Sequence, residues 1–351
     1  MTKKRGENGL VKAGDILTPR IVRQISGPTP IQRRLIDTAL AHFEQPPDQK
    51  RSLLYQHSVL CQTYLPYRDP GDEQREWERL NGDVHLLVKA GEAMHPETRR
   101  LVRFGLPYGP KCRLVLMYIN QHALISKSPQ LHDIQDSLTA FVRRVLKLDP
   151  KGRNIETVKE QLKRLSTAFI TLGFVGDFAD GTGAETDYVK IVRQFNLWLP
   201  KDDRQRVLWP SYIDLSLDYF ESLMAHAVPL DEAHIGALSH SGLALDIYVW
   251  LAQRLHRIPA NKPAFVPWAA IHAQFGQSYT GPNAMRSFRA DFKAALKQVL
   301  ALYKTARITE DESRKPQRFI SQGGKSVWRE PLAKGLTLHN SPSPVPPRII
   351  V

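Results

Sequence analysis

Two stretches of the sequence, about 130 residues apart, share the pattern that most constrains the fold. The first is "RNIETVKEQLKRLSTAFITLG", which starts at Arg153, and the second is "GPNAMRSFRADFKAALKQVLALYKTA", which starts at Gly281. In both, apolar residues recur at spacings of three and four, the periodicity of one face of an α-helix. Lys and Arg lie away from that face. The sequence therefore predicts two amphipathic helices, each with a cationic outer side.

The segments around these two helices also follow one order. The first unit reads as helices over 112–125, 137–148 and 153–169, then a hairpin over 169–199. The second reads as helices over 243–258, 266–276 and 283–303, then a shorter hairpin over 306–321. The flanks of the first hairpin are rich in β-branched and aromatic residues and its turn is Gly-rich, as strands and turns require. Similar spacing of the elements in both units suggests a repeated domain plan.

Three helices followed by a hairpin is the winged-helix plan, in which the third helix enters the DNA major groove. We therefore expect an α+β, mainly helical fold of tandem winged-helix domains. A length of 351 residues allows about two domains. The expected division is a basic N-terminal segment with a short helix (1–50), a first winged-helix-like domain (51–228), a second winged-helix domain (229–322) and a disordered tail punctuated by Gly and Pro (323–351).

The charge of the chain indicates a polyanionic partner. Lys and Arg number 49 against 35 Asp and Glu, giving a net charge of +14, which fits nucleic acid or an anionic surface. No apolar run reaches the ~18 residues of a membrane span, and the N-terminus lacks the apolar segment of a secretory signal. Cys61 and Cys112 form no CxxC motif and are expected to be buried thiols in a reducing cytoplasm.

The expected DNA contacts of the second unit lie on its third helix and its hairpin. At 100° per residue, four cations fall within a sector of about 80°: Arg286, Arg289, Lys293 and Lys297. Asn283 and Ser287 lie near the helix start, where base edges are usually read. The hairpin adds Arg314, Lys315 and Arg318. The alternative is an ordinary solvated face on a surface helix.

The third helix of the first unit is less clearly cationic. Its candidate contacts are Lys159, Lys163 and Arg164. Glu156 and Glu160 stand three or four residues away and can pair with them along the helix. We therefore expect this unit to rely partly on Lys151 and Arg153, which precede the helix, and on its own hairpin.

The sequence contains few motifs typical of an enzyme. The sequence has no HxH pair, and "GGKS" at 323–326 has Phe319 where a phosphate-binding loop needs a Gly. His234 and His240 are expected to be structural or exposed. We expect no catalytic activity, no metal site and no cofactor.

Several long blocks of the chain closely resemble the plasmid-encoded RepA replication initiators. They are "LYQHSVLCQTYLPYRDPGDE", "GLPYGPKCRLVLMYIN", "SLTAFVRRVL", "VKEQLKRLSTAFI", "PLDEAHIGALSHSGLALDIYVWLAQRL" and "PWAAIHAQFGQSY", followed by "FRADFKAAL". The resemblance covers about Gln56 to Ile308.

That resemblance implies a cytoplasmic bacterial protein that binds repeated duplex sites at a plasmid origin, with a part in plasmid copy control. It implies origin opening and recruitment of the host helicase and host initiator, and by analogy a switch between monomer and dimer. Two alternatives stay open: a transcriptional regulator that acts by occlusion alone, and a DNA-processing enzyme.

Overall fold

The computed structural model describes twelve stretches of the chain, and everything below refers to them. They are residues 28–44, 51–94, 98–132, 140, 142–143, 152–178, 181–189, 191–195, 212–311, 318–320, 326–328 and 334–345. Side chains between residues 174 and 190, at 194, 195, 212 and 311, and in 318–328 are outside the description.

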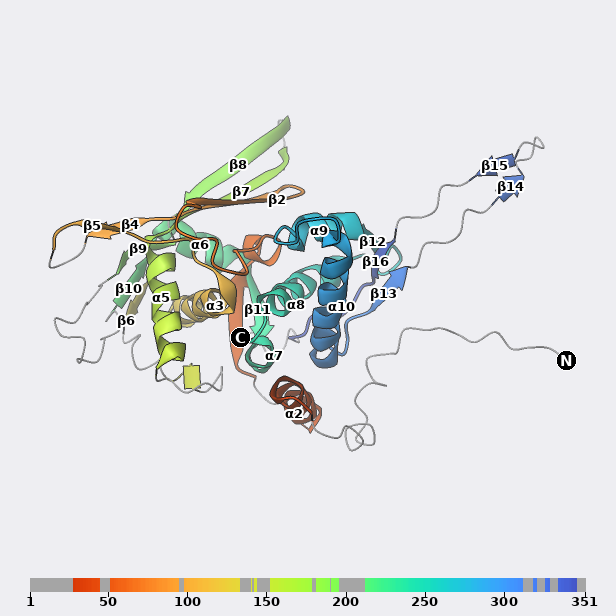
Figure 1. Ribbon diagram of the computed structural model, residues 1–351, viewed down its shortest axis with the longest axis horizontal. Helices are drawn as coiled ribbons and strands as arrows, with labels where there is room; N and C mark the ends of the chain where they lie inside the picture. The colour runs from red at the N-terminus through yellow and green to blue at the C-terminus, as the bar shows by residue number, and fades with distance from the viewer. Residues whose placement is uncertain are drawn as a thin grey trace.

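Two apolar helices form the centre of the molecule (Figure 1). They are α3 (Gly109–Ser126) and α8 (Gly242–Arg254), and nearly every residue in the middle of each is buried. A helix that is apolar all round is stable only when other elements cover it on every side. α5 (Arg153–Thr167) packs on α3, α3 packs on α8, and α10 (Ala284–Leu302) packs on α8. The four helices therefore form a row, with the two predicted cationic helices on its outer sides.

The other described helices pack around this row. They are α2 (Pro30–Glu44), α6 (Leu217–His226), α7 (Glu232–Leu238), α9 (Trp268–Phe275) and the 3₁₀ turns η2 (Val59–Cys61) and η3 (Leu255–Arg257). At the start of α2, Thr29 and Gln32 exchange hydrogen bonds between side chain and backbone, which caps the helix. Pro30 is the first helical residue, where its missing N–H costs nothing.

Each half of the chain contains a small three-stranded sheet of the same topology. In the first half β6 (Gln130–His132), β9 (Val192–Phe195) and β10 (Tyr212–Leu215) are ordered β6-β10-β9. In the second half β12 (Ala264–Pro267), β13 (Ile308–Asp311) and β16 (Gly335–Leu338) are ordered β12-β16-β13. In both sheets the last strand lies between the first two and pairs antiparallel with each.

The other strands form ribbons and one larger sheet. A four-stranded antiparallel sheet has the order β2-β3-β7-β8, and the two-stranded sheets are β1-β11, β4-β5 and β14-β15. Their bounds are β1 (Leu53–His57), β2 (Glu76–Asn81), β3 (Val84–Lys89), β4 (Glu92–Met94), β5 (Leu101–Arg103), β7 (Phe169–Phe178), β8 (Gly181–Val189), β11 (Ala227–Asp231), β14 (Arg318–Ile320) and β15 (Ser326–Trp328).

The first predicted hairpin is confirmed in part, since β7 and β8 pair from Ile170↔Val189 to Phe178↔Gly181. The hairpin is also part of a larger sheet, because β7 pairs with β3 on its other side. The predicted apolar stripe of the preceding helix ends one turn early. Phe169 begins β7 and is exposed, whereas Ile155, Val158, Leu162 and Leu165 are buried. The helix expected over 137–148 lies outside the described residues except for positions 140 and 142–143, which are helical.

The second predicted hairpin is wrong in its pairing. β13 pairs with β16, and β14 pairs with β15. The prediction of a disordered tail from residue 323 is therefore wrong for 334–345. β16 is the central strand of its sheet, and Leu336, Leu338 and Val345 are buried. A four-residue strand carries too little periodicity to be recognised, and its pairing partners lie about 25 and 70 residues earlier.

One apolar core runs through both halves, from Leu35 on α2 to Leu338 on β16. The boundary expected after residue 228 falls within β11, which pairs with β1. Cys61 and Cys112 are both buried free thiols, as expected. Among the described helices none is both long enough and apolar enough to cross a bilayer.

Candidate nucleic-acid interface

Aromatic packing holds α10 in place. Phe288 and Phe292 are fully buried, and the Phe292 ring lies 5.6 Å from Trp268 and 5.3 Å from Phe275, both on α9. These are edge-to-face contacts, each of which adds about 0.5–1.5 kcal/mol to simple burial. The apolar face predicted from the sequence therefore docks α10 on α9 and α8 and leaves its opposite face outward.

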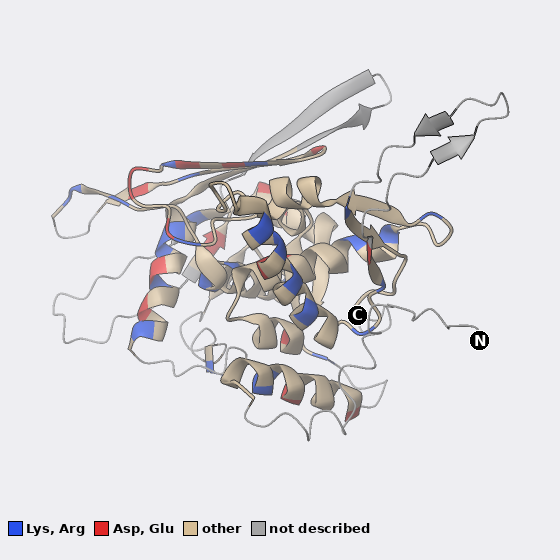
Figure 2. Ribbon diagram, turned by 45° about the vertical axis from the view of Figure 1, so that its right-hand side comes forward, with Lys and Arg blue, Asp and Glu red and all other residues tan. Residues whose placement is uncertain are grey.

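The outward face of α10 carries part of the predicted cationic surface. Asn283, Arg286, Ser287 and Lys297 are exposed. The Asn283 side chain makes no capping hydrogen bond, and the first turn contains no acidic residue. Figure 2 shows Lys and Arg recurring along this helix. A helix N-terminus without acidic side chains keeps its positive dipole end available to an anion such as phosphate.

The other two cations of the predicted stripe have partners inside the protein. Lys293 Nζ lies 2.5 Å and Arg289 Nη2 3.8 Å from the Oε1 atom of Glu310 on β13. Both cations also lie over the ring of Trp268, at 5.1 Å for Arg289 and 5.7 Å for Lys293. Arg289 is on the edge of the stripe nearest the apolar face, so its side chain reaches the rings that dock the helix. The structure thus places all four cations on one side but gives two of them structural contacts.

On α5 the cations are paired more extensively. Lys159 Nζ lies 3.2 Å from Glu156, and Arg164 contacts Glu160 at 2.9 Å and Asp69 at 3.2 Å. Arg164 also donates to the Leu106 carbonyl at 3.1 Å, and its side chain is only 11% exposed. In Figure 2 acidic and basic residues alternate along this helix. Arg164 therefore joins α5 to the segment before α3 and is poorly placed to reach DNA.

The remaining predicted contacts of the first unit divide into two groups. Arg153 is exposed at the start of α5, and Lys163 is half-buried with no ion pair among the described residues. Lys151 lies outside the described residues. So do the hairpin cations Arg314 and Lys315, whereas the backbone of Arg318 begins β14.

A buried ion pair joins the two halves. Arg113 on α3 and Asp246 on α8 make two contacts of 2.7 Å, and both side chains are almost inaccessible. The guanidinium donates its other hydrogens to backbone carbonyls of residues 65, 66 and 109. Burial opposes the charge of Arg113, but the neighbouring Asp246 carboxylate raises its pKa above the ordinary value. Every guanidinium donor is satisfied, which is what a buried charge requires.

Sequence reasoning missed this pair, although a signal was present. Arg113 and Asp246 each lie within the most apolar part of their helix. A lone charge in such a helix needs a partner of opposite sign, so the two could have been matched. Glu310 offered no such signal, because it lies in a segment rich in charges.

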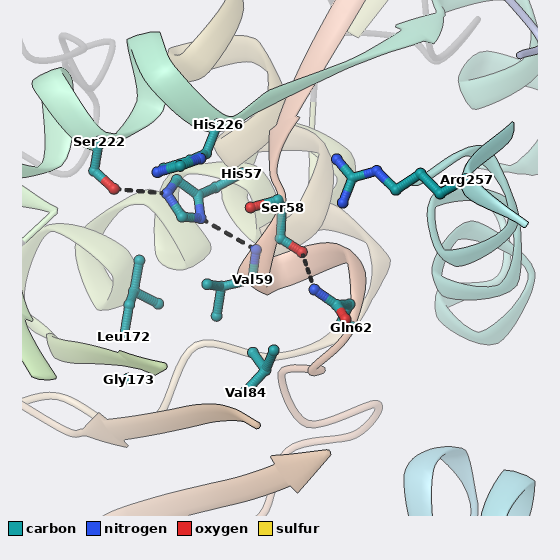
Figure 3. A pocket seen from close by; sticks show the side chains of 10 residues that line it. All are labelled: His57, Ser58, Val59, Gln62, Val84, Leu172, Gly173, Ser222, His226 and Arg257. Carbon is teal, nitrogen blue, oxygen red and sulfur yellow. Dashed lines mark hydrogen bonds between the residues drawn. The ribbon is translucent and has the colours of Figure 1, made fainter. Parts of the chain in front are cut away.

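A cavity of about 400 Å³ lies between η2, α6 and the β3–β7 strands. Figure 3 shows His57, His226, Ser222 and Arg257 around it. His57 Nδ1 accepts a hydrogen bond from the Val59 N–H, so Nε2 carries the proton and donates to Ser222 Oγ at 3.0 Å. Burial, with the nearby His226, lowers the pKa of His57 to about 4. His57 therefore has no lone pair left with which to deprotonate Ser222, and the Ser–His contact is not that of an activated nucleophile.

Comparisons with known proteins found a family model and several similar solved structures. Residues 106–269 match the family model described as "Plasmid encoded RepA protein". The fold is similar to the crystal structure of RctB domains 2-3 (RctB-155-483), with a TM-score of 0.46 and 9% identity over 80% of this chain and 96% of that one. It is also similar to a crystal structure of SeMet derivatives of domains 2 and 3 of RctB, with a TM-score of 0.44 and 9% identity over 88% and 98%. No curated protein matches the sequence.

Proposed function

We propose that this chain, whose residues 106–269 match the family model of plasmid-encoded RepA proteins, is a replication initiator that binds repeated duplex sites at a plasmid origin. The family supports a role in plasmid replication. The observation that carries the DNA-binding part of the proposal is the outward face of α10, where Arg286 and Lys297 have no ion-pair partner among the described residues and Asn283 and Ser287 are exposed.

Each half of the chain is proposed to act as a winged helix. In both, a buried helix precedes a short strand, a cationic helix follows, and two more strands complete a three-stranded sheet. That order is the one in which winged-helix proteins place their recognition helix and wing. By this assignment α5 and α10 are the recognition helices. The hairpin β7-β8, which lies between α5 and β9 in the chain, and the hairpin β14-β15, which lies between β13 and β16, are the proposed wings.

The row of helices gives the two recognition helices a suitable separation. Packed helices lie about 8–10 Å apart. Three successive contacts, α5 to α3 to α8 to α10, therefore span at most about 24–30 Å. One turn of B-DNA rises about 34 Å. A monomer could thus address two neighbouring major grooves on one face of the duplex, with a small bend of the DNA or tilt of the helices.

Binding is tested with duplexes that carry the repeats found next to the gene on its own replicon. Fluorescence anisotropy should give an affinity for the repeat at least about 10³-fold above that for a scrambled duplex of equal length. The affinity should fall steeply with salt, because each phosphate contact releases counterions. Equal binding to both duplexes would leave a basic protein without site recognition and would contradict the proposal.

Initiation, as distinct from occlusion, needs a second readout. Permanganate should detect unpaired thymines in a supercoiled origin plasmid only when the protein is present, and a pull-down should retain host helicase or host initiator. Binding without strand opening would favour a regulator that acts by occlusion. We also propose that the chain is not a nuclease, so the same plasmid incubated with Mg²⁺ or Mn²⁺ should stay supercoiled.

A further inference from the structure

Three metal-ligating side chains meet where α2 contacts the start of α7. They are His42 in the last turn of α2, Asp231 at the end of β11 and His234 on α7. One ligand atom of each lies within 4.8 Å of the others. The His42 and His234 rings are 4.7 Å apart, and His42 Nδ1 is 3.8 Å from Asp231 Oδ2.

Two buried atoms of this cluster lack a hydrogen-bond partner in the described part of the chain. They are Nε2 of His234 and Oδ2 of Asp231, and both residues are only 2% exposed. Buried polar atoms are nearly always hydrogen-bonded, so two unpartnered buried atoms in one cluster need an explanation. The cation Arg51 is 3.5 Å from Oδ2, which is longer than a normal hydrogen bond.

The other atoms of the two buried ligands are already held. Asp231 Oδ1 accepts from the N–H groups of Ala233 and His234, which caps α7. His234 Nδ1 is 3.1 Å from the Tyr248 hydroxyl. A metal-binding His usually uses its second nitrogen in this way, which fixes the ring and leaves the first nitrogen for the ion.

We propose that His42, Asp231 and His234 form a binding site for a Zn²⁺-type divalent ion, with water as the fourth ligand. Two imidazoles and a carboxylate are a ligand set that Zn²⁺ uses. With bonds of about 2.0–2.2 Å, tetrahedral donors lie roughly 3.3–3.5 Å apart. The observed separations therefore need to close by about 1 Å, which rotation of the His42 side chain can supply. Arg51 and Lys304 are the cations that face the cluster, and they lower its affinity for the ion.

The ion would fasten α2 to the body of the protein. Without it, α2 is held by the buried residues Leu35, Ile36 and Ala39 and by Arg34, which donates to Ser239 Oγ at 3.0 Å. In the last turn of α2, Lys304 Nζ lies 5.3 Å from the centre of the Phe43 ring, and His42 lies next to Asp231. Coordination through His42 adds an anchor there.

Binding is tested with Zn²⁺ on the full chain, measured by competition with a chromophoric chelator. We expect one high-affinity ion per chain. His42→Ala and Asp231→Asn should each weaken binding by about tenfold or more, and Asp231→Asn keeps a side chain that can cap α7. The matched control is His226→Ala, which alters the other close pair of histidines, His57 and His226. It should leave the affinity unchanged.

A second readout separates this site from adventitious binding to surface histidines. Zn²⁺ should slow hydrogen exchange of the α2 amides in the natural sequence and in His226→Ala, but not in His42→Ala. Circular dichroism should show that all variants are folded. The proposal is overturned if Zn²⁺ does not bind, or if the His42 and Asp231 variants bind it as tightly as the natural sequence. It is also overturned if Zn²⁺ does not change the rate of hydrogen exchange of the α2 amides.

Discussion

α5 and α10 both dock an apolar face on a central helix and carry cations on the other side, yet they offer different surfaces to a partner. On α5 the carboxylates come from the same helix, and Glu156 and Glu160 pair with Lys159 and Arg164. The cations of α10 pair, among the described residues, with Glu310 on β13, which contacts Arg289 and Lys293 but not Arg286 or Lys297. The number of cations on a helix therefore says little about DNA binding until their partners are known.

The largest expected effect concerns the link between the two halves. Arg113→Met leaves Asp246 buried without a cation, and breaking such a pair typically costs about 3–5 kcal/mol of unfolding free energy. Urea denaturation followed by circular dichroism measures this loss. The double variant Arg113→Met/Asp246→Leu should regain part of it, because apolar side chains of similar size can replace a buried ion pair. A loss below about 1 kcal/mol in the single variant would contradict the role given to this pair.

The next effect sharpens the contrast between the two helices. Arg286→Ala on α10 should weaken binding to the origin repeat by about 1–3 kcal/mol and relax specificity at one base pair. Lys297→Ala should weaken binding to all sequences and lower the magnitude of the log-affinity against log-salt slope by about one. Fluorescence anisotropy at several salt concentrations measures both.

The matched control is Lys262→Ala, which removes an exposed charge from the second half but not from α10. It should change affinity much less than either α10 variant. The double variant Arg286→Ala/Lys297→Ala is preferable to replacement of all four cations, because Arg289 and Lys293 also contact Trp268. Unaltered binding by the folded double variant would remove α10 from the interface.

A smaller effect separates structural from DNA-facing cations on α5. Arg164→Ala removes contacts with Glu160, Asp69 and the Leu106 carbonyl and should lower the unfolding free energy by about 1 kcal/mol. Lys163→Ala should leave stability within about 0.5 kcal/mol and slightly weaken DNA binding. If Lys163→Ala proves the more destabilising of the two in urea, the assignment of these roles is reversed.

The smallest effect comes from Glu310. Glu310→Gln keeps the shape of the side chain but frees Lys293 and Arg289 from their carboxylate. Stability should change by less than about 1 kcal/mol, as for other partly exposed ion pairs. The magnitude of the salt slope of DNA binding should rise by about one, because one more cation can release a counterion. An unchanged slope would mean that neither cation reaches phosphate.

The sequence by itself determined the helices and their buried faces. The apolar periodicities of α5, up to Leu165, and of α10 are local patterns, and the structure confirms them. The order of elements in the two halves suggested a repeated plan, and each half contains a three-stranded sheet of the same strand order. The Glu-flanked character of α5 was visible too, because its partners are three and four residues away.

Only the tertiary structure decided which residues meet across the chain. β16 lies at the centre of its sheet although its four residues carry no recognisable pattern. Glu310 reaches α10, and Arg113 reaches Asp246 across 133 positions. His42 meets Asp231 and His234 because α2 folds back onto α7. These contacts join residues far apart in the sequence, and their free energy depends on burial and on the geometry of the partner, neither of which a local pattern contains.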